Sequence, residues 1–481
     1  MTGIGMSVAP IRDELPAGET RAEAAPAARG GPWRETVLTG WGRTSRATSL
    51  AARPERQSAL RSALQQAEGS TVLAYGAGRS YGDAALNDGG HALLTERLDR
   101  LVSFDSETGE LVAEPGVTFK TVMEVLLPRG WMVPVTPGTA FATLGGAVAN
   151  DVHGKNQESA GNFGDHLNWI ELLTADGSIV RASPAENAEL FRATVGGIGL
   201  TGVVTSLSLN LARVPGNAAA VTLKRLPDLD SVIEGLTTPH PGTPYSVAWI
   251  DALSGGRNLG RGILELAAPS DTPLPEKAAR AKALPLDLPG FVLSGPTVRA
   301  FNELYWRRIP AGGAQRTVPW RDFLYPLDAI HQWNRMYGKA GFHQFQCVVP
   351  MPGAPAAIRM LLEALGRAGR ASFLAVLKAM GRPGLGHLSF AQPGLTLAVD
   401  IPNRPGVEAL LAELERLTLD AGGRVYLAKD SALSPQGFRA MYPRLPEFRE
   451  ALATWDPQGR FDSDMARRLR IREDLGREEQ L

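Results

Sequence analysis

Residues 137–164 read PGTAFATLGGAVANDVHGKNQESAGNFG, and the predicted fold is built around this glycine-rich segment. It places six glycines among small Thr, Ala, Ser and Asn residues, and residues 130–150 around its start carry no charge. Glycine lets the backbone approach a neighbouring group closely, and bare N–H groups in successive turns bind anions. The segment therefore predicts either a site for a phosphate-bearing cofactor or a glycine-rich loop without a ligand.

A second glycine-rich loop lies upstream, at residues 76–83, which read GAGRSYGD. It directly follows a short apolar run at 72–75 that predicts a buried strand. The loop is not the dinucleotide-binding fingerprint, because the third glycine of that motif would fall at Tyr81. It predicts a second place where the backbone approaches a ligand.

A formal match to that fingerprint occurs at Gly197, Gly199 and Gly202. It follows a predicted helix at 185–194 and leads into a predicted strand at 203–211, whereas the dinucleotide-binding turn leads from a strand into a helix. We therefore expect these glycines to end a helix and begin a strand, and not to hold a pyrophosphate.

The composition limits the classes of function. The 481 residues predict about two or three domains. Lys plus Arg (50) equal Asp plus Glu (50), so there is no basic excess to bind nucleic acid. The single cysteine, Cys347, excludes internal disulfides and cysteine-based metal sites, and the seven histidines lack paired ligand spacing, so no bound metal is predicted.

The two ends of the chain differ from its middle. Residues 1–32, rich in Ala, Pro, Gly and charge, predict a disordered extension, and residues 475–481 predict a charged tail. No apolar core follows a basic start, so no secretory signal is expected. The uncharged run at 130–150 is interrupted by prolines and glycines and is not predicted to cross a membrane. We expect a protein that is cytoplasmic or peripheral to the plasma membrane.

The segment 33–212 alternates predicted strands with helices, which indicates an α+β domain. Its expected strands are 72–75, 91–94, 101–105, 110–114, 169–173 and 203–211, and its expected helices are 55–68, 118–127 and 185–194.

The segment 213–423 predicts an antiparallel sheet with helices on one side. Its expected strands are 245–251, 342–350, 371–378 and 395–401, and its expected helices are 355–368 and 407–421. A strand at 424–429 and a helical, charged part up to 474 follow. We interpret 213–423 as a second domain inserted into the first, to which 424–474 returns.

Several spaced motifs occur in the order found in a known family. They are residues 76–83, Pro137-Gly138-Thr139, Gly145-Gly146-Ala147, His153-Gly154-Lys155-Asn156, Ser159-Ala160-Gly161 and Gly199-Leu200-Thr201-Gly202. With them the chain resembles the PCMH-type FAD-binding domain of the vanillyl-alcohol-oxidase superfamily. The resemblance implies a two-domain α+β fold in which FAD lies in the N- and C-terminal pieces and an inserted antiparallel-sheet cap domain forms the substrate pocket.

Residues 426–431 (YLAKDS), 440–444 (AMYPR) and 463–469 (SDMARRL) resemble a narrower group, the decaprenylphosphoryl-β-D-ribose 2′-oxidase family. The similarity runs from about 41 to 469. It implies oxidation of the ribose 2′-hydroxyl to a 2′-keto intermediate, the first half of the 2′-epimerisation that yields the arabinose donor for cell-wall arabinan. A separate NADH-dependent reductase would complete it. Oxidation of a free sugar, alditol or aldonolactone, and a flavin-binding module without turnover, stay open as alternatives.

The resemblance also implies how FAD is held. Members that tether flavin covalently often have a histidine just before the serine of the first glycine loop. Arg79 precedes Ser80 here, so non-covalent FAD is predicted. The implied cofactor-binding residues are Gly76, Gly78, Arg79, Ser80, Tyr81, Gly82, Pro137, Gly138, Thr139, Thr143, Gly145, Gly146, Asn150, His153, Gly154, Asn156, Ser159, Gly161, Gly202, Val203 and Tyr426.

The resemblance implies Lys429 and His153 as catalytic residues. Oxidation of a secondary alcohol needs an acceptor for the hydroxyl proton. Lys429 would contact the hydroxyl, either as a base with a lowered pKa or as an orienting donor; without the resemblance it reads as a surface lysine beside Asp430. His153 is either near the flavin or structural, and Lys155 is either part of the site or a solvated charge.

Substrate-binding positions lie mainly in the cap segment. Alternation along 342–350 puts Gln344 and Gln346 on one face, which is either a sugar-binding face, as the resemblance implies, or an exposed polar face. Trp249 and Tyr325 match pocket positions but are equally typical of core aromatics. Lys378 either pairs with a substrate phosphate or extends along the sheet to solvent.

Thr396, a further implied substrate-binding residue, and Ala398 stand where close family members have Asn and a pocket Cys, and Val247 replaces a polar residue. A less polar pocket wall is expected. The proline-rich apolar segment 284–296 either forms a lid or a membrane-facing surface, or packs on its own domain.

Overall fold

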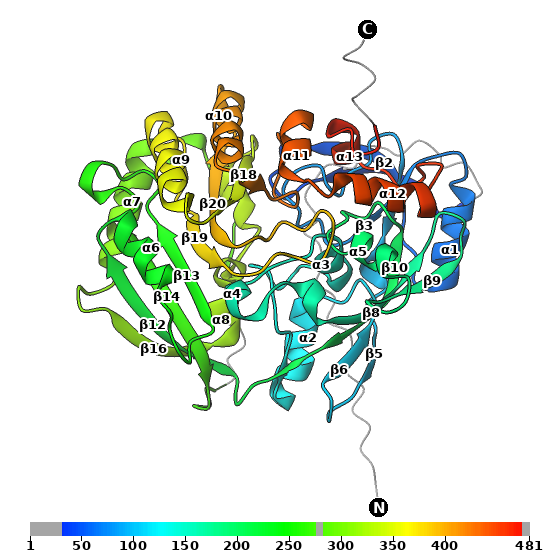
Figure 1. Ribbon diagram of the computed structural model, residues 1–481, viewed down its shortest axis with the longest axis horizontal. Helices are drawn as coiled ribbons and strands as arrows, with labels where there is room; N and C mark the ends of the chain where they lie inside the picture. Colours follow the sequence, from blue (N-terminus) through cyan, green and yellow to red (C-terminus); the bar gives the residue numbers. More distant parts are fainter. Residues whose placement is uncertain (1–30, 276–281, 474–481) are drawn as a thin grey trace, which may run out of the picture.

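The computed structural model describes residues 31–275 and 282–473 (Figure 1). The predicted tail at 475–481 and almost all of the predicted extension at 1–32 lie outside the described residues. The chain forms a mixed α+β structure with three main sheets, which confirms the predicted fold class. In the ranges described, no helix combines the length and apolar character needed to cross a lipid bilayer.

Two sheets come from the N-terminal part of the chain and lie together on the right of Figure 1. The four-stranded sheet has the order β1 (Arg34–Thr39), β2 (Arg46–Ala52), β4 (His91–Leu94), β3 (Val72–Tyr75). The five-stranded sheet has the order β5 (Leu101–Phe104), β6 (Glu110–Ala113), β10 (Val203–Asn210), β8 (Leu167–Leu173), β9 (Ile179–Ala182). The helices of this part are α1 (Gln57–Gln66), α2 (Phe119–Leu126), α3 (Leu144–Ala149), α4 (Gln157–Ala160) and α5 (Ala188–Thr194).

The middle of the chain forms an eight-stranded antiparallel sheet, on the left of Figure 1. Its order is β16 (Ala314–Pro319), β12 (Ala218–Leu226), β14 (Gly262–Ser270), β13 (Tyr245–Ile250), β19 (Ala375–Met380), β20 (Gly394–Pro402), β18 (Phe342–Pro350), β21 (Arg424–Val425). The helices here are α6 (Leu229–Thr237), α7 (Gly295–Arg307), α8 (Trp320–Leu324), α9 (Ala354–Ala368) and α10 (Val407–Asp420). Small pairs join β7 (Trp131–Met132) to β11 (Ala212–Arg213) and β15 (Lys282–Ala283) to β17 (Ile330–His331).

The two faces of the eight-stranded sheet have different neighbours. Ala248 and Leu377 belong to the hydrophobic core that also contains the buried residues of α6, α9 and α10. Their chain neighbours Trp249 and Lys378 point to the other face and line a large cavity. Because side chains alternate along a strand, α6, α9 and α10 cover one face of the sheet. The other face packs in part on α7 and α8 and also borders the cavity.

After β21 the chain returns to the N-terminal sheets through α11 (Pro435–Met441), α12 (Leu445–Trp455) and α13 (Asp464–Arg468). Val72 N donates to Arg460 O at 2.8 Å, and Asp462 N donates to Val72 O at 3.2 Å, so the C-terminal piece runs beside β3. The domain boundaries at 212, 423 and 474 stay predictions.

An arginine ties this C-terminal piece to both halves of the site. Arg468 pairs with Asp83 of the first glycine loop (Nε to Oδ2, 2.7 Å) and with Asp430, next to Lys429 (Nη2 to Oδ2, 2.8 Å). The glycine loop and the turn that carries Lys429 are therefore held in a fixed relation by one guanidinium.

Two predicted strands differ from the structure. β19 begins at Ala375 and not at 371, because Ser372 Oγ accepts a hydrogen bond from Leu374 N (3.1 Å) and closes a turn before it. The strand predicted at 424–429 ends at Val425, because the amides of Lys429 and Asp430 both donate to Tyr426 O (2.9 and 3.0 Å). Lys429 therefore lies on a tight turn and not at a strand end.

Candidate active site

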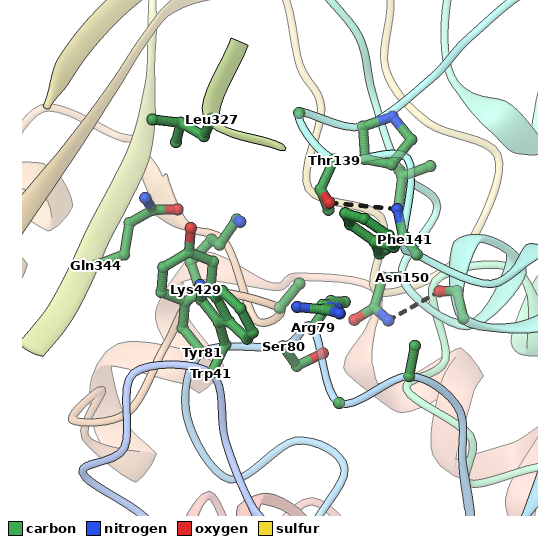
Figure 2. Close-up of a pocket in the computed structure, with 18 of the residues that line it drawn as sticks. Trp41, Arg79, Ser80, Tyr81, Thr139, Phe141, Asn150, Leu327, Gln344 and Lys429 are labelled. Atoms are coloured by element: carbon green, nitrogen blue, oxygen red, sulfur yellow. Dashed lines mark hydrogen bonds between the residues drawn. The ribbon is translucent and has the colours of Figure 1, made fainter. Parts of the chain in front are cut away.

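One cavity of about 1840 Å³ lies between the glycine-rich loops and the open face of the eight-stranded sheet. It is larger than the roughly 300–1,000 Å³ that is common for small-ligand pockets, so it has room for a dinucleotide and a second ligand. Figure 2 shows the part where side chains from both sides meet, with Gln344 on the sheet side and Arg79, Ser80 and Asn150 on the loop side.

The first glycine loop is shaped by close contacts that a side chain would prevent. A Cβ on Gly76 would lie 2.6 Å from Thr143 Oγ1 of the second glycine segment, so the two loops pack directly together. Gly78 has a φ of 61° and a Cβ there would lie 2.2 Å from Tyr75 Oη. Both glycines line the cavity, so the loops present bare backbone to whatever fills it.

Three buried polar atoms on the cavity-lining residues have no hydrogen-bond partner within the described protein. They are Arg79 Nε, Asn150 Oδ1 and His153 Nδ1. Unpaired buried polar atoms are costly, and these come from two glycine-rich loops that face one cavity. The residues present fit a large polar ligand such as FAD, which would supply the missing partners.

Arg79 is held by aromatic stacking. Its guanidinium carbon lies 4.3 Å from the ring centroid of Trp41 and 5.2 Å from that of Phe141. Burial lowers the pKa of Arg79, and the nearby Asp328 carboxylate opposes this shift. Asp328 itself accepts from Thr139 Oγ1 (2.8 Å) and Ala140 N (2.7 Å). A cation is thus positioned between the two glycine loops before any ligand binds.

Lys429 reaches into the cavity from its turn, beside Gln344 and above Tyr81 (Figure 2). Its Nζ lies 3.9 Å from the ring centroid of Tyr81. Burial lowers the pKa of Lys429 to about 7, while the charge of Asp400 raises it. At neutral pH the amine is therefore available in both its neutral and its protonated form.

His153 sits in an aromatic pocket on the second glycine segment. Its ring centroid lies 5.1 Å from that of Tyr426 and 5.4 Å from that of Phe390. Gln346 Nε2 lies 3.0 Å from His153 Nε2 and donates to Thr396 Oγ1 at 3.2 Å. Burial and the nearby lysine charges hold the pKa of His153 well below its usual value, so the ring is neutral and can accept from Gln346.

Most of the predicted site residues do line the cavity. They are Gly76, Gly78, Arg79, Ser80, Tyr81, Pro137, Gly138, Thr139, Thr143, Gly145, Gly146, Asn150, His153, Gly154, Gly202, Val203, Trp249, Gln344, Gln346, Lys378, Tyr426 and Lys429. Gln344 and Gln346 share one face of β18, and that face is turned to the cavity and not to the outer surface.

The remaining predicted residues do not line the cavity and instead contact the residues or segments around it. Asn156 Nδ2 donates to Pro134 O (2.8 Å), and Ser159 Oγ donates to Pro244 O (3.0 Å). Thr396 supports Gln346, and Tyr325 is buried behind the cavity wall. Gly82 packs on the backbone of Asp430, and Gly161 packs on Asp165 and Arg382. These six residues contact other parts of the protein and do not line the cavity, because each lies one layer behind the residues that do.

Pattern analysis missed Asp400, Asp328 and Trp41. Asp400 is fully buried on β20, accepts from Gln344 and Tyr337, and has a pKa raised to about 7 by burial. Its signal was available, since one acidic residue interrupts the apolar run GLTLAVDIP at 394–402. Asp328 lies in a short 3-10 helix (Pro326–Ala329) and Trp41 in a turn, and both are too short to give a periodic signal.

Comparison with known proteins gives matches over most of the chain. Residues 48–183 match the family described as FAD binding domain, and residues 398–469 match D-arabinono-1,4-lactone oxidase. Decaprenylphosphoryl-beta-D-ribose oxidase of Mycolicibacterium smegmatis is 38% identical over 456 residues, which cover 90% of this chain and 97% of that protein. An uncharacterised protein of Streptomyces coelicolor is 36% identical over 375 residues, 73% of this chain and 100% of that one. A probable mitochondrial D-lactate dehydrogenase of Danio rerio is 29% identical over 172 residues, 34% of each chain.

Proposed function

The chain belongs to the family of FAD-dependent oxidoreductases acting on CH–OH groups that includes decaprenylphosphoryl-beta-D-ribose oxidase, and from this premise we propose that it oxidises the 2′-hydroxyl of a polyprenylphosphoryl ribose to a ketone. One observation carries the proposal: the Lys429 amine, with its pKa lowered to about 7, enters a cavity whose opposite walls are bare glycine backbone and the amides of Gln344 and Gln346.

Bound FAD supplies the two-electron acceptor for this reaction. The glycine loops and the stacked Arg79 would hold it, since these residues line the cavity and carry buried polar atoms that have no partner within the described protein. Gln344 and Gln346 would orient the sugar hydroxyls. Neutral Lys429 Nζ would take the proton of the reacting hydroxyl, which requires a base whose pKa is close to the working pH.

We further propose that FAD is bound without a covalent bond. The position before Ser80 is occupied by Arg79, whose guanidinium is stacked on Trp41 and is a poor nucleophile for flavin attachment. The loop therefore contributes charge and aromatic surface, and affinity comes from many weak contacts.

The mouth of the cavity supports a lipid-bearing substrate. Leu286 (71% exposed) and Phe301 (46% exposed) line it, and Phe291 (72%) and Leu304 (72%) lie in the same part of the chain. Exposed large apolar side chains near a cavity are typical of surfaces that meet lipid or protein. We propose peripheral contact with a membrane at this face, and a separate NADH-dependent reductase as the enzyme that reduces the 2′-keto product.

A second candidate is oxidation of a free sugar or aldonolactone, which the match of residues 398–469 to D-arabinono-1,4-lactone oxidase favours. Anaerobic bleaching of the bound flavin distinguishes the two. We expect farnesylphosphoryl-ribose to bleach the flavin faster than ribitol or arabinono-1,4-lactone at equal concentration. Faster bleaching by the lactone would favour the second candidate, and a spectrum that no substrate changes would indicate a flavin-binding module without turnover.

A further inference from the structure

Three lysine amines face the same region of the cavity. Lys155 follows His153 and Gly154 in the second glycine segment, Lys378 lies on β19, and Lys429 lies on its turn. The positive charges of Lys155 and Lys429 both act on Lys378, so the three amines are close enough to repel one another.

Two of these charges have a carboxylate that offsets them. Lys155 Nζ lies 3.5 Å from Glu265 Oε2, donates to Phe323 O at 2.6 Å and sits 4.2 Å from the Phe323 ring centroid. Lys429 is stabilised by the charge of Asp400. The region thus contains three lysines and two carboxylates.

Lys378 is the amine left without an anion. Its Nζ donates to Gly154 O at 3.2 Å, and no carboxylate of the described residues lies within salt-bridge distance of it. An ammonium group in an enclosed site, next to other cations and bonded only to a carbonyl, is electrostatically unfavourable. A bound ligand anion would supply the missing negative charge.

Lys378 and Gln346 line the same cavity from two different strands of the eight-stranded sheet. The strand of Lys378, β19, is separated from β18 by β20 alone, so the two strands lie about 10 Å apart. Lys378 is offset from Gln346 by two residues along the sheet, and both side chains turn toward the same cavity. An anion at Lys378 and a sugar ring between Gln346 and Lys429 can therefore be bound together. The walls beyond Lys378, at Val376 and Trp249, are apolar and suit the start of a hydrocarbon chain.

We infer that Lys378, backed by Lys155, binds the anionic phosphodiester group that links sugar to lipid in the substrate. The inference rests on the proposed function and adds to it the element that selects lipid-linked sugar phosphates over neutral sugars. A free pentitol or aldonolactone leaves Lys378 unpaired, so it gains no charge-assisted hydrogen bond at this position.

Farnesyl methyl phosphate, a diester with one fixed negative charge and no sugar, tests this subsite, and farnesol is the neutral control. Binding to the flavin-loaded enzyme is measured by calorimetry. We expect Lys378→Met to weaken the diester about tenfold or more and to leave farnesol unchanged, and Lys378→Arg to retain most of the affinity. Equal affinity of wild type and Lys378→Met for the diester overturns the inference, as does an equal loss for farnesol.

The pH dependence gives a second readout. Lys378 has a pKa lowered to about 7 by burial and by its cationic neighbours, so diester affinity of the wild type should fall as pH rises through about 7. The groups facing it are His153, Lys155 and Lys429, with Glu265 behind Lys155. In Lys378→Arg the diester affinity should fall less with pH, because arginine does not lose its proton near pH 7. A fall equal to that of the wild type would mean that a neighbouring group, and not Lys378, binds the anion.

The two proposals fail differently. If farnesylphosphoryl-ribose does not bleach the flavin of the wild type, the proposed function is wrong whatever Lys378 does. If it does so and Lys378→Met keeps both the wild-type KM and the wild-type diester affinity, the oxidation stands and the phosphate subsite is wrong.

Discussion

The side-chain nitrogen of Gln344 lies 2.5 Å from Oδ1 of Asp400, its direct cross-strand partner on β20. Asp400 is fully buried and also accepts from Tyr337 Oη at 2.9 Å, so it does not itself line the cavity. It fixes the Gln344 amide, which does line the cavity, and its charge raises the pKa of Lys429. Asp400, which lies outside the cavity, therefore orients one cavity-lining side chain, Gln344, and raises the pKa of another, Lys429.

Asp400→Asn should shift the pH dependence of substrate oxidation. Removing the negative charge lowers the pKa of Lys429 further, so the neutral amine is present at lower pH, and the rising limb of the rate moves toward acid. The measurement is the rate of anaerobic flavin reduction between pH 5.5 and 9. Ser372→Ala, which removes a hydrogen-bond partner of Tyr337 without changing charge, is the matched control. An unmoved limb in Asp400→Asn would contradict this role.

Lys429→Met should keep flavin and lose reduction by substrate by about 10²–10⁴-fold, since this is the usual contribution of a positioned base. In the wild type the rate should rise with pH through about 7, because the neutral amine becomes the major form above its pKa. Stopped-flow absorbance of the flavin gives both results. Lys339→Met, at an exposed lysine, is the control; equal rates in the two variants would remove Lys429 from the chemistry.

Gly78→Ala should lower the flavin content of the purified protein. Gly78 lies in the loop that faces the cavity and has a φ of 61°. Its added Cβ would lie 2.2 Å from Oη of Tyr75, the last residue of β3. Gly89→Ala is a matched control, because Gly89 has a φ of 71° and open space around it. Both substitutions carry a backbone cost of about 1–2 kcal/mol, which thermal unfolding will show. Only Gly78→Ala should lose FAD, measured by absorbance per mole of protein; an equal loss in both would mean that backbone strain alone explains it.

Acid precipitation should release the flavin into the supernatant, because Arg79 takes the place before Ser80 and is stacked on Trp41. The released material should have the mass and chromatographic retention of unmodified FAD. Yellow colour that stays with the precipitated protein would show a covalent attachment and overturn the non-covalent proposal.

The double substitution Phe291→Ser, Leu304→Ser should reduce binding to anionic phospholipid vesicles about tenfold or more, since each buried apolar side chain contributes about 1.5–3 kcal/mol. Sedimentation with vesicles measures it. Val37→Ser, Val102→Ser is the control, because these side chains are also exposed (60% and 59%) but lie on the N-terminal sheets. Equal losses in the two double variants would locate the contact elsewhere.

Local patterns were enough to predict the glycine loops, the α+β class and the shared face of Gln344 and Gln346 on β18, but not that this face is turned to the cavity. Gln344 and Gln346 fall on one face because side chains alternate along any strand. The strand β12 was missed, because its first residues are alanines that carry no strand preference. Turns closed by backbone hydrogen bonds, such as the one at Tyr426 to Lys429, were also missed, since composition does not encode them.

The amino-acid sequence alone indicates which loops expose bare backbone and that Gln344 and Gln346 share one face of a strand, since glycine content and alternation are properties of neighbouring residues. The pKa values of the site residues, and which charges lie near one another, are set only in the folded protein. Asp400 meets Gln344 from a different strand, and Lys378 meets Lys155 and Lys429 from three separate segments. Burial and Coulomb energy depend on distances in space, and those distances exist only once remote segments are packed together.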